Sequence, residues 1–172
     1  NAEIIMFEKG PYVSYSNCSI PYRLSETVDQ TEKLILNTPE SFLGIYNIQV
    51  RVSSEVIAID PAGKKVRVRD LKNSREYEET YDKLILSPGA DAVIPPIKGI
   101  EEANLFTVKT VEDITRFYSF LKKEQAKKIS VIGGGFIGIE VAVNLKEAGY
   151  QVALVEAMPQ ILRTYDYYMF QI

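Results

Sequence analysis

Short apolar runs and amphipathic stretches follow one another along the chain and predict an α/β fold. The apolar runs are typical of buried strands and lie at residues 2–7, 84–86, 105–108, 129–132 and 152–155. Apolar residues at helical spacing predict amphipathic helices over 111–121 and 137–148. Residues 48–86 instead alternate apolar and polar side chains, which indicates a small antiparallel β-meander.

Capping residues set the expected ends of the helices. Thr110 is a good N-cap for the first of them, and Gly149 is a plausible C-terminal cap for the second. A further helix is expected after Pro159. Another is expected to begin at Cys18, because Pro21 is tolerated in a first helical turn.

The meander has an expected inner face and an expected outer face. Its turn is the segment 61–64, and its inner face would be supplied by Val66, Val68 and Leu71. The basic residues between them are Lys65, Arg67 and Arg69. At this spacing they predict a solvated strand face rather than a binding patch.

Residues 128–156 form a strand–turn–helix–strand pattern with three glycines at G-x-G-x-x-G spacing. Gly133 allows a tight turn, Gly135 lets a pyrophosphate approach the backbone, and Gly138 lets the helix pack closely on the sheet. Glu156 ends the second strand, where it can accept hydrogen bonds from ribose hydroxyls. A glycine-rich turn can also serve packing alone, but the flanking strands and the terminal acid favour dinucleotide binding.

Coenzyme choice follows from the charge at the end of that strand. Glu156 would repel a 2′-phosphate, and no arginine or lysine lies in the residues just after it. The pattern therefore favours NADH over NADPH.

Two other positions have more than one interpretation. Glu8 ends the apolar run 2–7 as Glu156 ends its own strand, yet no glycine-rich turn precedes it, so an ordinary charged strand end remains open. Cys18 could be a small buried hydrophobe, the usual role of a lone cysteine. A helix N-terminus and polar neighbours would instead favour a reactive thiolate.

Composition narrows the possible classes. The 172 residues are 46% hydrophobic and carry a net charge of -3, which predicts a globular protein and offers no electrostatic case for nucleic acid or membrane binding. One cysteine and no histidine argue against a disulfide scaffold and a Cys/His zinc site. No signal peptide is evident, so a cytoplasmic setting is expected. Both ends of the pattern look cut, and a domain boundary is expected near residue 100.

Four motifs in order now carry a resemblance over essentially the whole chain. They are MFEKGPYVSYSNCSIPY, TPESF, YDKLILSPGA and VIGGGFIGIE with its terminal Glu156. Together they resemble the pyridine nucleotide–disulfide oxidoreductases, in particular the single-cysteine branch that includes coenzyme A disulfide reductase. The disulfide-paired members carry C-x-x-x-x-C, whereas this chain has Arg23 at the second cysteine position and Ser25 where a glycine commonly closes the motif.

The resemblance implies a Rossmann-like fold of two dinucleotide-binding domains, truncated at both ends. Residues 1–100 would be a partial FAD-binding domain with the cysteine segment and the meander, and residues 101–172 a partial NAD(H)-binding domain. FAD and NADH are the implied cofactors, and the intact protein would be a homodimer. The implied activity passes electrons from NAD(P)H through the flavin and one redox cysteine to coenzyme A disulfide or a related disulfide or persulfide.

The resemblance also assigns roles to individual residues. Cys18 would be the redox cysteine, and Ser14 and Asn17 would line the substrate thiol pocket. The residues implied to bind FAD are Glu8, Lys9, Ser87, Pro88 and Gly89, with Glu140 near the flavin. The residues implied to bind NADH are Gly133, Gly134, Gly135, Phe136, Ile137, Gly138 and Glu156, with Phe136 in place of the usual gating tyrosine.

Two other functions remain open at this point. In an NADH oxidase or peroxidase, Cys18 would cycle through a sulfenic acid. The chain by itself could also be an NAD-binding module without activity, because the first glycine-rich FAD loop and the dimerisation domain of the family are absent from it.

Overall fold

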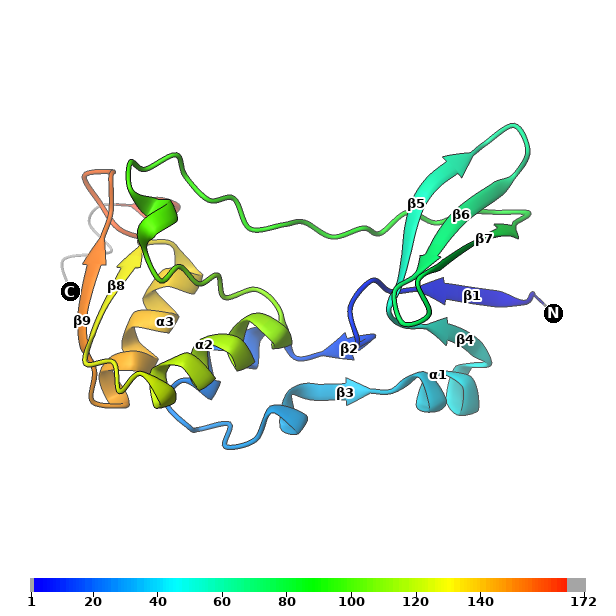
Figure 1. Cartoon of the computed structure of the whole chain (residues 1–172). Helices are drawn as coiled ribbons and strands as arrows, with labels where there is room; N and C mark the ends of the chain where they lie inside the picture. Colours follow the sequence, from blue (N-terminus) through cyan, green and yellow to red (C-terminus); the bar gives the residue numbers. More distant parts are fainter. Residues whose placement is uncertain (1, 167–172) are drawn as a thin grey trace. The chain divides into compact units, whose positions relative to one another are not determined.

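The computed structural model describes residues 2–166, which fall into two compact units (Figure 1). The first unit contains residues 35–90 together with the chain before Ser16, and the second contains residues 16–34 together with the chain from Asp91 onward. The sequence predicts one boundary near residue 100. By its contacts, the segment that carries Cys18 groups with the later part of the chain, because it packs on two of that part's helices.

The first unit contains a short parallel strand pair. Strand β1 (Ile4–Phe7) lies beside β4 (Ile48–Arg51), with Ile4 opposite Ile48 and Phe7 opposite Arg51. Helix α1 (Pro39–Tyr46) precedes β4 and begins at a capping box of Thr38 and Ser41. Strands β2 (Ser14–Tyr15) and β3 (Ile35–Asn37) form a separate antiparallel pair.

The predicted meander is confirmed. Strands β5 (Ser54–Asp60), β6 (Lys65–Asp70) and β7 (Arg75–Thr80) form one antiparallel sheet. Val66 and Val68 are buried on it, but Leu71 is 43% exposed, so its predicted place on the inner face is wrong. Leu71 lies in the turn just beyond β6, where the alternation of the strand no longer applies.

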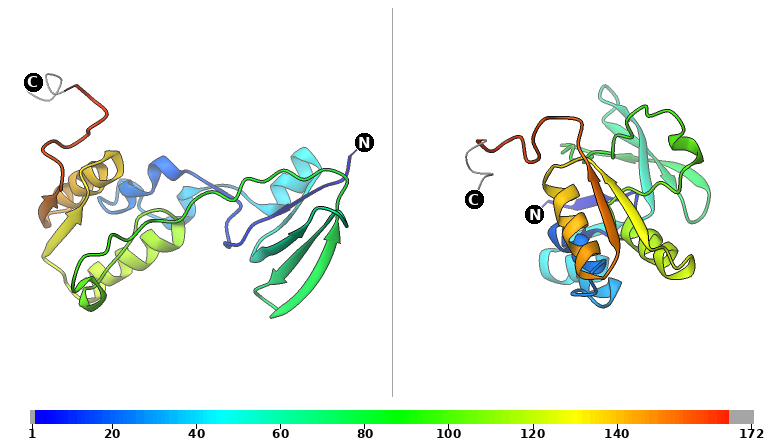
Figure 2. Two further views of the ribbon diagram at one scale, coloured as in Figure 1. Left: turned by 90° about the horizontal axis from the view of Figure 1, so that it is seen from above. Right: turned by 90° about the vertical axis from the view of Figure 1, so that its left-hand side faces the viewer.

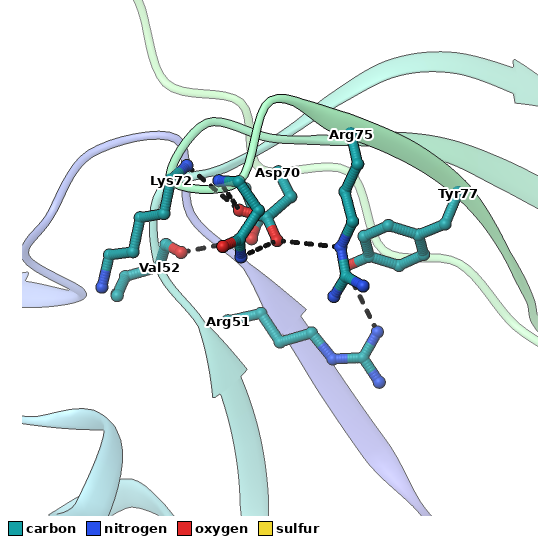
Figure 3. A network of polar contacts seen from close by, with 8 residues as sticks. Arg51, Val52, Asp70, Lys72, Arg75 and Tyr77 are labelled. Carbon is teal, nitrogen blue, oxygen red and sulfur yellow. Dashed lines mark hydrogen bonds and ion pairs between the residues drawn. The ribbon is translucent and has the colours of Figure 1, made fainter.

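Polar contacts hold the β6–β7 turn (Figure 3), and others join the strands on the outer face of the meander. Asp70 accepts hydrogen bonds from the backbone N–H groups of Lys72 and Asn73 and from Arg75 Nε. On the outer face, cross-strand ion pairs join Lys65 to Glu78 at 2.9 Å and Arg69 to Glu76 at 3.0 Å. Lys65 and Arg69 therefore lie on the solvated strand face that the sequence predicts, and each is paired there with an acid.

The second unit contains one strand–helix–strand element and a helix before it. Strands β8 (Lys128–Ile132) and β9 (Gln151–Val155) pair in parallel. Helix α3 (Phe136–Glu147) connects them and packs against the pair, as Figure 2 shows. Helix α2 (Val111–Lys123) begins at a capping box formed by Thr110 and Asp113. Its buried residues are Val111, Ile114, Phe117 and Leu121, whereas Tyr118 is half-buried.

Four short 3₁₀ helices complete the described elements. They are η1 (Asn17–Ser19), η2 (Pro21–Arg23), η3 (Thr31–Leu34) and η4 (Ile100–Glu102). The helix expected from Cys18 onward is therefore two consecutive 3₁₀ turns rather than an α-helix. No helix among residues 2–166 is long and apolar enough to cross a membrane.

Two predicted strands are wrong. Residues 84–86 and 105–108 are not strands, and Ile85 is 88% exposed. A strand needs a neighbour to take up its backbone hydrogen bonds, and no described strand pairs with either segment. The residues from Pro159 to Asp166 form bends and turns, and the rest of the helix expected there lies outside the described residues.

Candidate functional site

The glycine-rich turn is closed on one side by its own backbone. Gly133 has a φ of 105°, a conformation that side chains other than glycine rarely adopt. A Cβ atom placed on Gly138 would lie 1.9 Å from the carbonyl oxygen of Gly133. The start of α3 therefore sits directly against the turn, which is the close packing that the spacing predicts.

The other side of the turn is open. A Cβ atom placed on Gly133 or Gly135 would meet no heavy atom within 4 Å. Gly135 is the N-cap of α3 and supplies no side-chain cap, so the first N–H groups of the helix have no partner within it. An open backbone and free N–H groups at the start of a 12-residue helix fit the phosphates of a dinucleotide.

Glu156 is fixed beside this turn. Its carboxylate accepts hydrogen bonds from the N–H of Gly134 at 2.7 Å and from the N–H of Met158 at 2.9 Å. These backbone donors, Met158 first, lower the pKa of Glu156 below its ordinary value, and the charge of Arg163 contributes further. The carboxylate is thus held ionised at the end of β9, where a ribose would lie.

The segment after Glu156 folds back onto the glycine-rich turn, a contact that the sequence pattern does not predict. The N–H of Leu162 donates to the carbonyl of Gly134 at 2.8 Å, and a Cβ on Gly134 would lie 2.6 Å from Ile161 Cγ2. The rings of Phe136 and Tyr165 pack edge to face, with their centroids 5.8 Å apart. The one sequence feature that points to this segment is Arg163, a basic residue seven positions after Glu156 and therefore outside its immediate neighbours.

Cys18 lies in η1 and is exposed. Its exposure excludes the interpretation of Cys18 as a small buried hydrophobe. A three-residue 3₁₀ helix aligns few peptide dipoles, so the helix-dipole reason for an activated thiol loses its basis. The adjacent Asn17 is also exposed, and the hydroxyls of Ser16 and Ser19 lie 2.7 Å apart across the same turn.

The remaining candidates belong to the first unit. Glu8 accepts a hydrogen bond from the N–H of Gly10 at 2.6 Å, the same two-residue contact that Glu156 makes with Met158. Lys9 forms an ion pair with Glu55 at 3.1 Å. Ser14 lies in β2. The other residues implied to bind FAD in this unit are Ser87, Pro88 and Gly89, and all three are exposed.

The structure brings together the candidates of the second unit that surround the glycine-rich turn. Gly134 and Glu156 are in direct contact, and Phe136, Ile137 and Glu140 follow on α3. Asn17 and Cys18 belong to the same unit, whose η2 segment packs against α3.

This geometry agrees with comparison to known proteins. The model of the family described as pyridine nucleotide-disulphide oxidoreductase matches residues 1–171. The chain belongs to this family. Membership accounts for the Rossmann-type element around Gly133 and for the separate small antiparallel sheet.

Individual members of the family are similar over nearly all of the chain. Coenzyme A disulfide reductase of Staphylococcus aureus is 38% identical over 165 residues, which are 96% of this chain and 37% of the relative. An NADH oxidase of Methanocaldococcus jannaschii is 36% identical over 160 residues, which are 93% of this chain and 36% of the relative.

A solved structure extends the likeness to three dimensions. The structure of reduced Bacillus anthracis CoADR-RHD matches with a TM-score of 0.94 at 41% identity, covering 97% of this chain and 30% of that one. The chain thus spans little more than a third of the length of the curated relatives that it matches.

Proposed function

We propose that the protein containing this chain is an FAD-dependent oxidoreductase that passes electrons from NADH to a small disulfide. Coenzyme A disulfide or a related persulfide is the substrate class, in keeping with the relatives of 38% and 41% identity named above. The observation that carries the proposal is one exposed cysteine in the same unit as an open glycine-rich turn. The second sulfur of each redox cycle then belongs to the substrate.

The residues present fit their part of the cofactor set. The N–H groups at the start of α3 would hold the NADH pyrophosphate, and Glu156 would hold the ribose beside it. Glu8 ends a strand of a parallel pair as Glu156 does, which suits the ribose of FAD. When bound, FAD supplies a relay that accepts a hydride and delivers electron pairs to sulfur.

The chemistry assigned to Cys18 is thiol–disulfide exchange. The Cys18 thiolate attacks one sulfur of the disulfide, forms a mixed disulfide and expels the other half as a thiolate. Two electrons derived from NADH then cleave the mixed disulfide and release the second thiol. One NADH, one proton and one disulfide therefore give NAD⁺ and two thiols.

An anaerobic assay of the intact protein tests this proposal. With NADH and coenzyme A disulfide, we expect two thiols to appear for each NADH consumed. NADH consumption without thiol release would contradict the proposal.

The relative named NADH oxidase makes a second candidate specific. In that case NADH consumption would require oxygen or peroxide, and a sulfenic acid at Cys18 would be trapped by a dimedone probe. A protein that binds NADH but transfers electrons to none of these acceptors would be a binding module.

Coenzyme choice gives a further prediction. Replacing Glu156 by glutamine should weaken NADH binding about 10- to 100-fold, because a hydrogen-bonded charge at the ribose is lost. The same change should strengthen NADPH relative to NADH, because Arg163 then faces the 2′-phosphate without a competing carboxylate. Dissociation constants for both coenzymes, from quenching of protein fluorescence, measure the two effects.

The matched control adds Arg163→Gln to Glu156→Gln. This double variant should lose the gain in NADPH affinity while NADH affinity stays at the level of the single variant. Equal NADH affinity in the wild type and the Glu156→Gln variant would contradict the assignment of the ribose contact. Because the pKa of Glu156 is lowered, the wild-type carboxylate keeps its charge to a lower pH than an ordinary glutamate does, and the NADH affinity that depends on this charge is lost as the pH falls through that lowered pKa.

A further inference from the structure

A partly buried hydrogen-bond chain joins the cysteine segment to the helix that follows the glycine-rich turn. Ser25 Oγ donates to Asn144 Oδ1 at 2.6 Å, and Asn144 Nδ2 donates to the backbone carbonyl of Glu140 at 2.8 Å. Asn144 is only 2% exposed, so bulk water does not replace a partner that is removed. The amide has a partner at each end, and the Ser25 side chain provides one of them.

The backbone between Cys18 and Ser25 is continuous and closely bonded. The N–H of Ile20 donates to the carbonyl of Asn17, and the N–H of Arg23 donates to the carbonyl of Ile20. Ile20 ends η1 and also caps η2, and its side chain is 2% exposed. Two linked turns therefore connect Ser25 to Cys18.

Helix α2 provides a second attachment for the same segment. Glu26 accepts hydrogen bonds from Tyr118 Oη at 2.7 Å and from Lys122 Nζ at 2.6 Å. The guanidinium of the buried Arg23 lies 3.7 Å from the centre of the Tyr118 ring. The η2 turn packs against both α2 and α3, and η3 packs against α2 (Figures 1 and 2).

We propose that Ser25 and Asn144 are positioning residues that hold Cys18 in a fixed register on α3, the helix whose start would bind NADH. This inference rests on the proposed function and adds to it a contact outside the family pattern, in which a glycine commonly occupies position 25. A glycine has no hydroxyl and cannot make this bond. In this chain the bond makes the reactive thiol and the nucleotide helix one rigid piece.

The test compares Ser25→Ala with Ser25→Thr in the intact protein. The rate at which iodoacetamide alkylates Cys18 is followed against pH by mass spectrometry of the peptide that contains it. We expect Ser25→Ala to change the rate and Ser25→Thr to restore it, because threonine keeps the hydroxyl. Turnover with the disulfide should fall about tenfold in Ser25→Ala while KM for NADH is unchanged.

A double-variant cycle separates the bond from general stability. If Ser25 and Asn144 act as one unit, Ser25→Ala combined with Asn144→Ala should be no slower than the slower single variant. Effects that multiply would overturn the proposal, and so would a lower Tm in Ser25→Ala with an unchanged alkylation profile. Thr115→Ala, which removes a hydroxyl that donates to the backbone carbonyl of Val111 on α2, is the matched control.

Failure of this inference is distinguishable from failure of the proposed function. Alkylation of Cys18 requires neither NADH nor a disulfide. A protein that lacks disulfide reductase activity can still show the difference between Ser25→Ala and Ser25→Thr, and an active protein can fail to show it.

Discussion

Replacing Cys18 by serine should reduce NADH-dependent release of thiols from coenzyme A disulfide by at least about 1,000-fold, because a serine hydroxyl does not exchange with a disulfide. The exposed Cys18 is the only cysteine in the chain, so no neighbouring thiol within it can take over. The anaerobic assay of the intact protein measures this loss. NADH affinity should remain that of the wild type, because the glycine-rich turn is unchanged.

Two controls make the result specific. Ser19→Ala alters the same turn but keeps the thiol, and it should retain most of the activity. Reaction of the wild type with iodoacetamide should reproduce the loss seen in Cys18→Ser, and the variant should not lose further activity on the same treatment. Wild-type rates in Cys18→Ser would place the chemistry elsewhere in the protein.

The sequence predicted best those elements whose stabilising contacts are local or lie within one strand–helix–strand unit. Capping at Thr110 by Asp113 and the turn at Gly133, which lies against Gly138, each depend on neighbours a few residues away. The meander was also predictable, because the alternation around Val66 and Val68 matches the period of a strand.

The errors occurred where position depends on a partner elsewhere in the chain. Residues 84–86 read as a buried strand from their apolar side chains, but in the described structure they pair with no strand. Leu71 lies one residue beyond the end of β6 and three residues after Val68, so the two-residue alternation does not place it on the face of Val66 and Val68. Apolar pattern measures the tendency to be buried, whereas a strand also needs a hydrogen-bonding neighbour that the pattern does not reveal.

The contacts of the candidate site likewise fall into those that the sequence predicts and those that it does not. The contact of Glu156 with the turn was predictable because both belong to one fingerprint. The contacts of Ser25 with Asn144 and of Leu162 with Gly134 were not predictable, since they join segments with no shared motif. One feature of the sequence did indicate the Ser25–Asn144 contact. Asn144 is a polar residue on the same helix as the buried Val141 and Leu145, and a buried polar side chain needs a hydrogen-bond partner.

The second large effect is expected at Gly135. Replacing it by valine should weaken NADH binding at least about 100-fold, because the side chain would occupy the space into which the pyrophosphate must come. The fold should be unaffected, since a Cβ at Gly135 meets no heavy atom within 4 Å and its φ of -78° is open to any residue. Fluorescence titration with NADH measures the loss of binding, and the Tm of the same samples shows whether the fold is affected.

A graded series sharpens this prediction. Gly135→Ala should show a smaller loss than Gly135→Val, because the obstruction grows with the side chain. Gly44→Ala is the matched control, because Gly44 also has open space around its Cβ position but lies on α1 in the first unit. Loss of NADH affinity together with a much lower Tm in Gly135→Val would show that the glycine supports the fold. A wild-type affinity would show that the pyrophosphate does not approach α3 at this point.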